Sequence, residues 1–82
     1  MTGIIVRSCA GHDKGQLFVI SGVSDKDDGC VYIADGKSRR IEKPKRKKLK
    51  HLKQTDRSIT VDESFTDKKI RETIKMLKAE LN

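Results

Sequence analysis

Lysine and arginine residues are concentrated in one short segment of this chain. Residues 37–53 contain ten of them and a single acid, Glu42, so the segment carries nine net positive charges with His51 counted as neutral. The whole chain of 82 residues carries +7, and the rest of it is therefore slightly acidic. Such a density of like charge is unfavourable unless an anion neutralises it. We expect that anion to be a nucleic-acid backbone, because each neutralised phosphate also releases bound counterions.

We expect the phosphate contacts to come from two groups of basic side chains. The first group lies in the basic loop predicted at 43–53 and consists of Lys43, Lys45, Arg46, Lys47, Lys48, Lys50 and His51. The second would extend the contact across the rim of the fold and consists of Lys14, Lys37, Arg39 and Arg40. Proteins that bind unstacked bases usually present several aromatic side chains. Phe18 and Phe65 are expected in the core, which leaves only Tyr32, so binding through backbone charge and RNA shape is favoured.

Other chemistry is disfavoured by the spacing of the reactive residues. Zinc-binding residue types are present, but they are scattered and no Cys-x-x-Cys pair anchors them; they are Cys9, His12, Cys30 and His51. We therefore expect no metal and no cofactor, and we expect both cysteines to be reduced, small core residues. A catalytic Cys–His pair is also disfavoured, because so short a chain has no second layer with which to build a pocket. The protein is not expected to be an enzyme.

The elements that must position the basic side chains begin with three strands. Runs of β-branched and other apolar residues predict these strands at 3–8, 16–23 and 30–34. Gly22 is expected to bend or bulge the second strand. Asp35 and Gly36 predict a tight type I′ hairpin turn after the third strand, because both positions of that turn favour positive φ angles.

The second half of the predicted sheet is less regular. A fourth strand is predicted over 37–42, with Ile41 facing inward. Pro44 lacks a backbone donor and pushes Lys43 into an extended conformation, so regular pairing is expected to end there. The basic run that follows is expected to form an extended loop. Alternating polar and apolar residues over 57–61 predict a fifth strand.

The chain is predicted to end in an amphipathic helix over 66–81. The helix has one apolar stripe, formed by Ile70, Ile74, Leu77 and Leu81. Ser64 or Thr66 could cap it. We expect the stripe to dock on the strands, and a surface for a partner protein is the alternative. The predicted fold is mostly β, a small antiparallel barrel of about five strands (1–62) with an appended C-terminal helix (63–82).

Part of the chain resembles a known family. Residues 4–20 consist of an apolar strand, a loop containing Gly11 and Gly15, and a second apolar strand, and this pattern looks like a KOW motif. The series Ala34-Asp35-Gly36-Lys37, Arg40 and residues 43–52 resembles short bacterial KOW-domain RNA-binding proteins. Those proteins are similar to the large-subunit ribosomal protein numbered fourteen in archaea and eukaryotes. The resemblance covers about residues 3–53, and the C-terminal helix lies outside it.

The resemblance implies an SH3-like barrel that binds RNA, most specifically ribosomal RNA of the large subunit, in a cytoplasmic and ribosome-associated protein. The loop glycines Gly11 and Gly15 would let RNA approach the main chain closely. His12 and Lys14 would add donors beside that backbone. The alternative function is an adaptor of the transcription or translation machinery, which would bind proteins through the barrel and the helix.

Membrane association is disfavoured. No apolar stretch approaches the ~18 residues of a membrane span. A basic helix on a membrane surface needs bulky apolar residues opposite its charges, and Leu49 and Leu52 are too few. The N-terminal residues also lack the pattern of a signal peptide.

Overall fold

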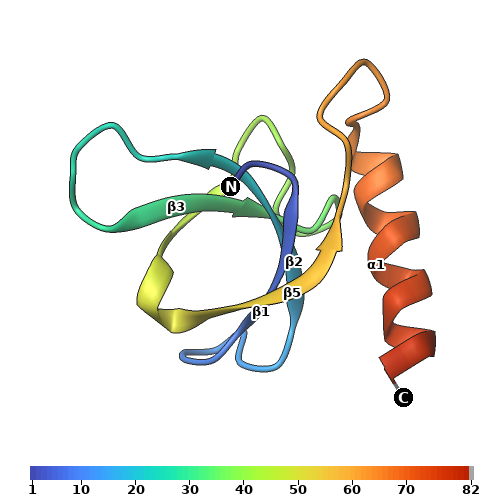
Figure 1. Cartoon of the computed structure of the whole chain (residues 1–82), viewed down its shortest axis with the longest axis horizontal. Helices are drawn as coiled ribbons and strands as arrows, with labels where there is room; N and C mark the ends of the chain where they lie inside the picture. The colour runs from blue at the N-terminus through green and yellow to red at the C-terminus, as the bar shows by residue number, and fades with distance from the viewer. Residues whose placement is uncertain (82) are drawn as a thin grey trace.

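The structure is a single curled sheet with a helix against it. The computed structural model describes residues 1–81 and, for Leu81, the backbone alone. Its elements are β1 (Ile4–Ser8), β2 (Leu17–Val23), β3 (Cys30–Ala34), β4 (Lys45–Lys48), the short 3-10 helix η1 (Leu49–His51), β5 (Leu52–Ser58) and α1 (Asp67–Leu81). The five strands pair antiparallel in the order β4-β3-β2-β1-β5 and curl into a small barrel-like body (Figure 1). The predicted fold class is confirmed, whereas the boundary between 62 and 63 stays a prediction.

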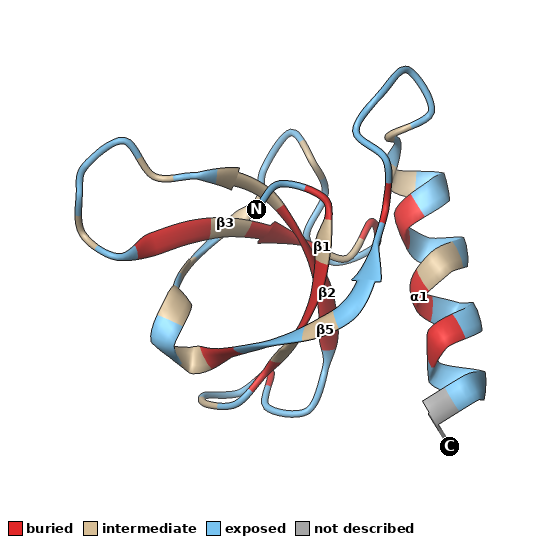
Figure 2. Ribbon diagram, viewed as in Figure 1, coloured by how far each residue is buried: buried red, intermediate tan, exposed pale blue. Residues whose placement is uncertain are grey.

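The central strands are buried on both faces. Side chains alternate between the two faces of a strand, so each apolar run supplies both. One cluster fills the barrel and contains Val6, Phe18, Ile20, Val31, Ile33 and Leu52. The other lies between the sheet and α1 and contains Ile5, Leu17, Val19, Ala34, Ile59, Ile70, Ile74 and Leu77. Figure 2 shows buried residues along β1, β2 and β3 and on α1. The predicted docking of the helical stripe is therefore confirmed, except for Leu81, whose side chain lies outside the described part.

Two local predictions about the strands and the helix are also confirmed. The register of β2 against β3 shifts between Ile20 and Gly22, which places the irregularity where the glycine predicted it. At the start of α1, the Thr66 hydroxyl oxygen accepts a hydrogen bond from the Lys69 backbone N–H at 3.2 Å. Thr66 therefore caps the helix and satisfies one of its free N–H groups.

The prediction of a strand over 37–42 and a basic loop over 43–53 was wrong, since β4, η1 and the start of β5 occupy residues 45–53. Residues 37–42 form turns and bends, and the next strand is β4, which lies in the run predicted as a loop. Asp35 Oδ1 accepts hydrogen bonds from the backbone N–H groups of Lys37 (2.9 Å) and Arg39 (2.8 Å), which closes a compact turn in place of a two-residue hairpin. Pro44 comes directly before β4, outside the paired residues, so the sheet does not need a backbone N–H donor at this position.

The fifth strand was also misplaced. It was predicted over 57–61, but β5 covers Leu52–Ser58 and pairs with β1. Only Leu52 of this edge strand is buried, so β5 lacks the apolar alternation that identifies a strand in sequence. Ile59, which suggested the strand, instead follows it and enters the core beside α1.

Candidate nucleic-acid interface

Strand β4 presents its cations alternately to two sides of the sheet edge. β4 pairs with β3 alone, and successive side chains of a strand point in opposite directions. Lys45 and Lys47 are half-buried, whereas Arg46 and Lys48 are exposed. Charged side chains on such an edge also discourage pairing with another chain. The basic run therefore divides into an inner and an outer set.

The inner set binds a buried carboxylate, that of Asp13. Lys45 Nζ donates to Asp13 Oδ2 at 2.7 Å, and Lys47 Nζ donates to Asp13 Oδ1 at 2.9 Å. The Ser8 hydroxyl donates to the same Oδ1 at 2.6 Å, and Lys47 Nζ also donates to the Ala10 carbonyl oxygen at 2.8 Å. We call Asp13, Ser8, Lys45 and Lys47 the Asp13 network. It ties the loop between β1 and β2 to β4.

The Asp13 network is electrostatically stable because its carboxylate is fully engaged. Burial alone would raise the pKa of Asp13, but the hydrogen bonds from Lys45, Ser8 and Lys47 outweigh it and hold that pKa well below the usual range. The Lys47 side chain is only 9% exposed. Sequence reasoning missed this role of Asp13, whose partner Lys45 lies 32 positions away. The one available signal was that Asp13 is the sole acid among residues 1–24.

In the outer set, Arg46 forms an ion pair at the surface. Its Nη2 donates to Asp28 Oδ2, and the other oxygen of Asp28 accepts a hydrogen bond from the Cys30 backbone N–H at 3.0 Å. The bond from Arg46 lowers the pKa of Asp28 to about 2 and raises the pKa of Arg46. The Arg46 side chain is still 51% exposed.

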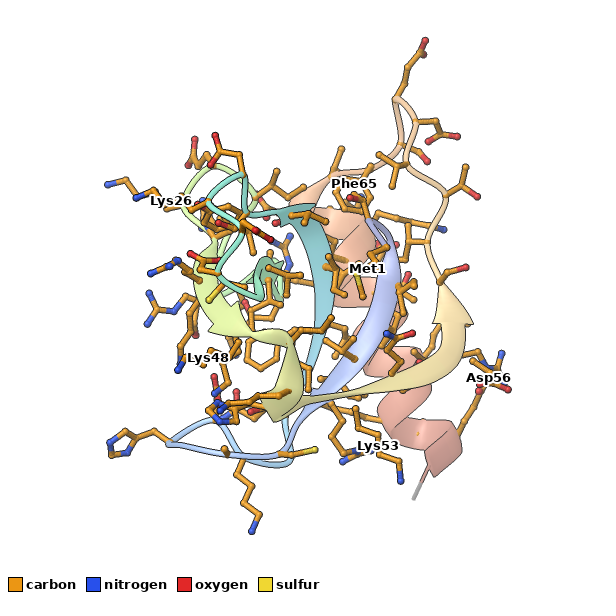
Figure 3. The ribbon with its side chains drawn as sticks, turned by 60° about the vertical axis from the view of Figure 1, so that its left-hand side comes forward. Met1, Lys26, Lys48, Lys53, Asp56 and Phe65 are labelled. Carbon is orange, nitrogen blue, oxygen red and sulfur yellow. The ribbon has the colours of Figure 1, made fainter. Side chains whose placement is uncertain are left out.

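The other seven cations of residues 37–53 are exposed, and none forms an ion pair within the described part of the chain. They are Lys37, Arg39, Arg40, Lys43, Lys48, Lys50 and Lys53. Lys48 and Lys50 line a shallow hollow of about 490 Å³ beside Leu49 of η1. Figure 3 shows Lys48 projecting away from the sheet. Lys48 and Lys50 are therefore the exposed cations at the edge formed by β4 and η1, whereas the other five lie on the turns between β3 and β4 or, for Lys53, on β5.

A second hollow, of about 250 Å³, brings together predicted residues from three distant segments. They are His12 from the loop between β1 and β2, Arg39 from the turn after β3, and Lys45 from β4. Lys14 is exposed on the same loop as His12. Gly11 and Gly15 have φ angles of +83° and +89°, in the region that favours glycine. The Arg7 guanidinium holds this loop by donating to the Gly15 carbonyl oxygen at 2.9 Å.

The cysteines and His51 occupy separate environments. Cys30 is buried as predicted, but the prediction for Cys9 was wrong, since its thiol is exposed. Cys9 follows β1, its backbone N–H donates to the His51 carbonyl oxygen at 2.8 Å, and its thiol donates to the Arg7 carbonyl oxygen at 3.7 Å. His51 itself is half-buried in η1. Among residues 1–81, no group of three or more His, Cys, Asp or Glu side chains could hold a metal ion.

Comparisons with known proteins do not assign this chain to a family. No model of a known protein family matches it, and no curated protein matches it. Within the described residues, no helix has the length and apolar character needed to cross a membrane. The KOW resemblance and the functions that it implies therefore stay predictions, and the functional argument depends on the residues themselves.

Proposed function

We propose that this protein binds the phosphate backbone of folded RNA through the exposed cations of residues 37–53 and has no enzymatic activity. The observation that carries the proposal is the group of seven exposed cations that form no ion pair within the described residues. Exposed like charges at this density repel one another, and a polyanion removes that repulsion while releasing its own counterions. In its most specific form, the proposal is that the RNA is ribosomal RNA of the large subunit and that the protein is ribosome-associated.

The individual cations have different parts in this proposal. Lys48 and Lys50 contact phosphates at the edge of the barrel, and Arg39, Arg40 and Lys43 extend the contact along the preceding turns. Lys37, in the turn after β3, and Lys53, on β5, add contacts at the two ends of the segment. Lys47 supports the loop between β1 and β2, because its ammonium group is nearly covered and already binds Asp13. Lys45 and Arg46 retain exposed surface and can contact a phosphate beside their acidic partners.

The aromatic side chains favour backbone contacts over base stacking. The chain has no tryptophan and only three other aromatic residues. Phe18 is buried, and Tyr32 and Phe65 are half-buried. Stacking of unpaired bases needs exposed aromatic faces, so the charge and shape of folded RNA fit this surface better. The apolar stripe of α1 is packed on the sheet, which leaves the adaptor alternative without that surface.

The test compares two double variants with equal loss of charge. Lys48→Ala/Lys50→Ala removes two proposed contacts, and Lys68→Ala/Lys69→Ala removes two exposed lysines from the first turn of α1. We expect the slope of log affinity for purified large-subunit ribosomal RNA against log salt to flatten by about 1.5 for the first variant, since each phosphate contact contributes about 0.7–0.9. The control slope should change little.

Two results would contradict the proposal. The first is no measurable binding of the wild-type protein to this RNA at about 0.1 M salt, where phosphate contacts are still strong. The second is an equal slope in both double variants, which would place the contacts elsewhere. The ribosomal form needs one further measurement in a cell extract. On a sucrose gradient, the protein should travel with the large subunit at low salt and leave it progressively as salt rises.

A further inference from the structure

A second group of cations lines a groove beside α1. The groove has a volume of about 410 Å³ and lies between α1, the start of β2 and the turn after β3. Leu17 and Ile74, both buried, supply its apolar part. Its cations are Lys37, Arg71, Lys75 and Lys78. Three of these come from α1, outside the basic segment that the sequence singled out.

The three helical cations form a row. Arg71, Lys75 and Lys78 have the spacing i, i+4 and i+7, which places them on one face over about 10 Å of helix. The row is therefore longer than a single phosphate group and can contact neighbouring phosphates of one backbone.

The two walls of the groove are fixed relative to each other. Arg71 Nη1 donates to the Gly36 carbonyl oxygen at 2.7 Å, and Asp67 Oδ1 accepts a hydrogen bond from the Ile41 backbone N–H at 2.9 Å. Gly36 has a φ of +77°, and a Cβ atom there would clash with the Asp67 carbonyl oxygen. The turn after β3 thus packs directly on the first turn of α1 and holds Lys37 beside the helix. A site built in this way needs little ordering before it binds.

The groove keeps a net positive charge after its acids are counted. Asp35 and Glu72 also line it. Asp35 is already engaged, since its carboxylate accepts the backbone N–H groups of Lys37 and Arg39. Within the described residues, none of the four cations of the groove forms an ion pair. An anion is therefore the class of ligand that the charges favour.

We propose that this groove binds the phosphate backbone of a second RNA segment, in addition to the segment bound by residues 37–53. The inference rests on the proposed function. Lys37 belongs to both sets of cations, so the turn after β3 connects the two surfaces. Figure 1 shows η1 and α1 on opposite sides of the barrel. An RNA in contact with both must therefore pass along the turn after β3.

The experiment uses the full chain and the purified large-subunit ribosomal RNA. Lys75→Ala/Lys78→Ala removes two cations of the groove, and Lys68→Ala/Lys69→Ala removes the same charge from the same helix outside the groove. We expect the groove variant to lose about 30-fold in affinity at 0.1 M salt and to flatten the salt slope by about 1.5, as for two lost phosphate contacts. All four lysines are exposed, and urea unfolding checks that each variant remains folded.

The outcomes separate this inference from the proposed function. If the wild-type protein binds and the groove variant behaves like its control on the same helix, the inference fails and the proposed function stands. If the wild-type protein does not bind the RNA, the proposed function itself fails. Combining Lys75→Ala/Lys78→Ala with Lys48→Ala/Lys50→Ala supplies a second check. Because distant sites contribute additively, the two losses in log affinity should sum if both surfaces contact RNA. A combined loss no larger than that of Lys48→Ala/Lys50→Ala alone would also overturn the inference.

Discussion

The two sides of β4 use the same type of residue in opposite ways. On the inner side, Lys45 and Lys47 bind the Asp13 carboxylate and fix the loop between β1 and β2. On the outer side, Lys48 is exposed and forms no ion pair in the described residues, and Arg46 forms a surface ion pair with Asp28. A count of basic residues treats all four as available to a ligand. In the structure, the alternation of side chains along β4 and the buried Asp13 carboxylate decide which of the four side chains remain exposed.

The difference between the two sides follows from solvation. A lysine as covered as Lys47 loses most of its hydration, so its charge is tolerated only beside a hydrogen-bonded anion. Water solvates the outer side chains, and an ion pair there adds little to stability. Inner residues should therefore control the stability of the fold, while outer residues should control the affinity for a polyanion.

The largest effect on stability should come from removing the shared acid. Asp13→Asn keeps the size of the side chain but leaves Lys45 and Lys47 without their anion. We expect the free energy of unfolding in urea to fall by about 3 kcal/mol, the lower end of the range for breaking a buried ion pair, because Lys45 is partly exposed. Asp25→Asn, at an exposed acid in the turn before β3, is the matched control. Equal losses in the two variants would show that the network is not stabilising.

The second prediction concerns how the stability of the fold changes at low pH. The folded pKa of Asp13 lies below its value in the unfolded chain, so its contribution to stability is complete above a pH of about 4 and is lost as the pH falls toward the folded pKa. Asp28, with a folded pKa of about 2, acts in the same direction. We expect the stability difference between wild type and Asp13→Asn to shrink between pH 6 and pH 2 in urea unfolding. A difference that does not change with pH would contradict the assignment.

The sequence predicted the elements that carry their own apolar pattern. β1, β2, β3 and α1 were found because their apolar runs and stripe indicate strands and a helix without knowledge of the partner. β4 is entirely cationic and β5 has one buried residue, Leu52, so neither has such a pattern. Their positions depend on contacts between distant residues, such as the hydrogen bond from Lys45 of β4 to Asp13, 32 positions apart.

The same reasoning limits what the sequence could say about the site. The basic segment was identified from its charge alone, because local density needs no structure. The side to which each cation points depends on where β4 begins, which the sequence misplaced. The cations beside α1 were not recognised as a surface, since Lys37 and Lys75 come together only when the turn after β3 packs on the helix.

The smallest effect should be found at the outer ion pair, between Arg46 and Asp28. Single substitutions are ambiguous here, since Asp28 also accepts the Cys30 backbone N–H and its removal disturbs the turn. A double-mutant cycle with Arg46→Ala and Asp28→Ala isolates the interaction between the two side chains. The matched cycle uses Lys47→Ala and Asp13→Ala. We expect the outer coupling to be the smaller of the two and to weaken with added salt, because salt screens exposed charges far more than buried ones. An outer coupling as large and as salt-resistant as the inner one would mean that the two sides of β4 do not differ energetically. Exposure would then be a poor guide to which cations remain available for RNA.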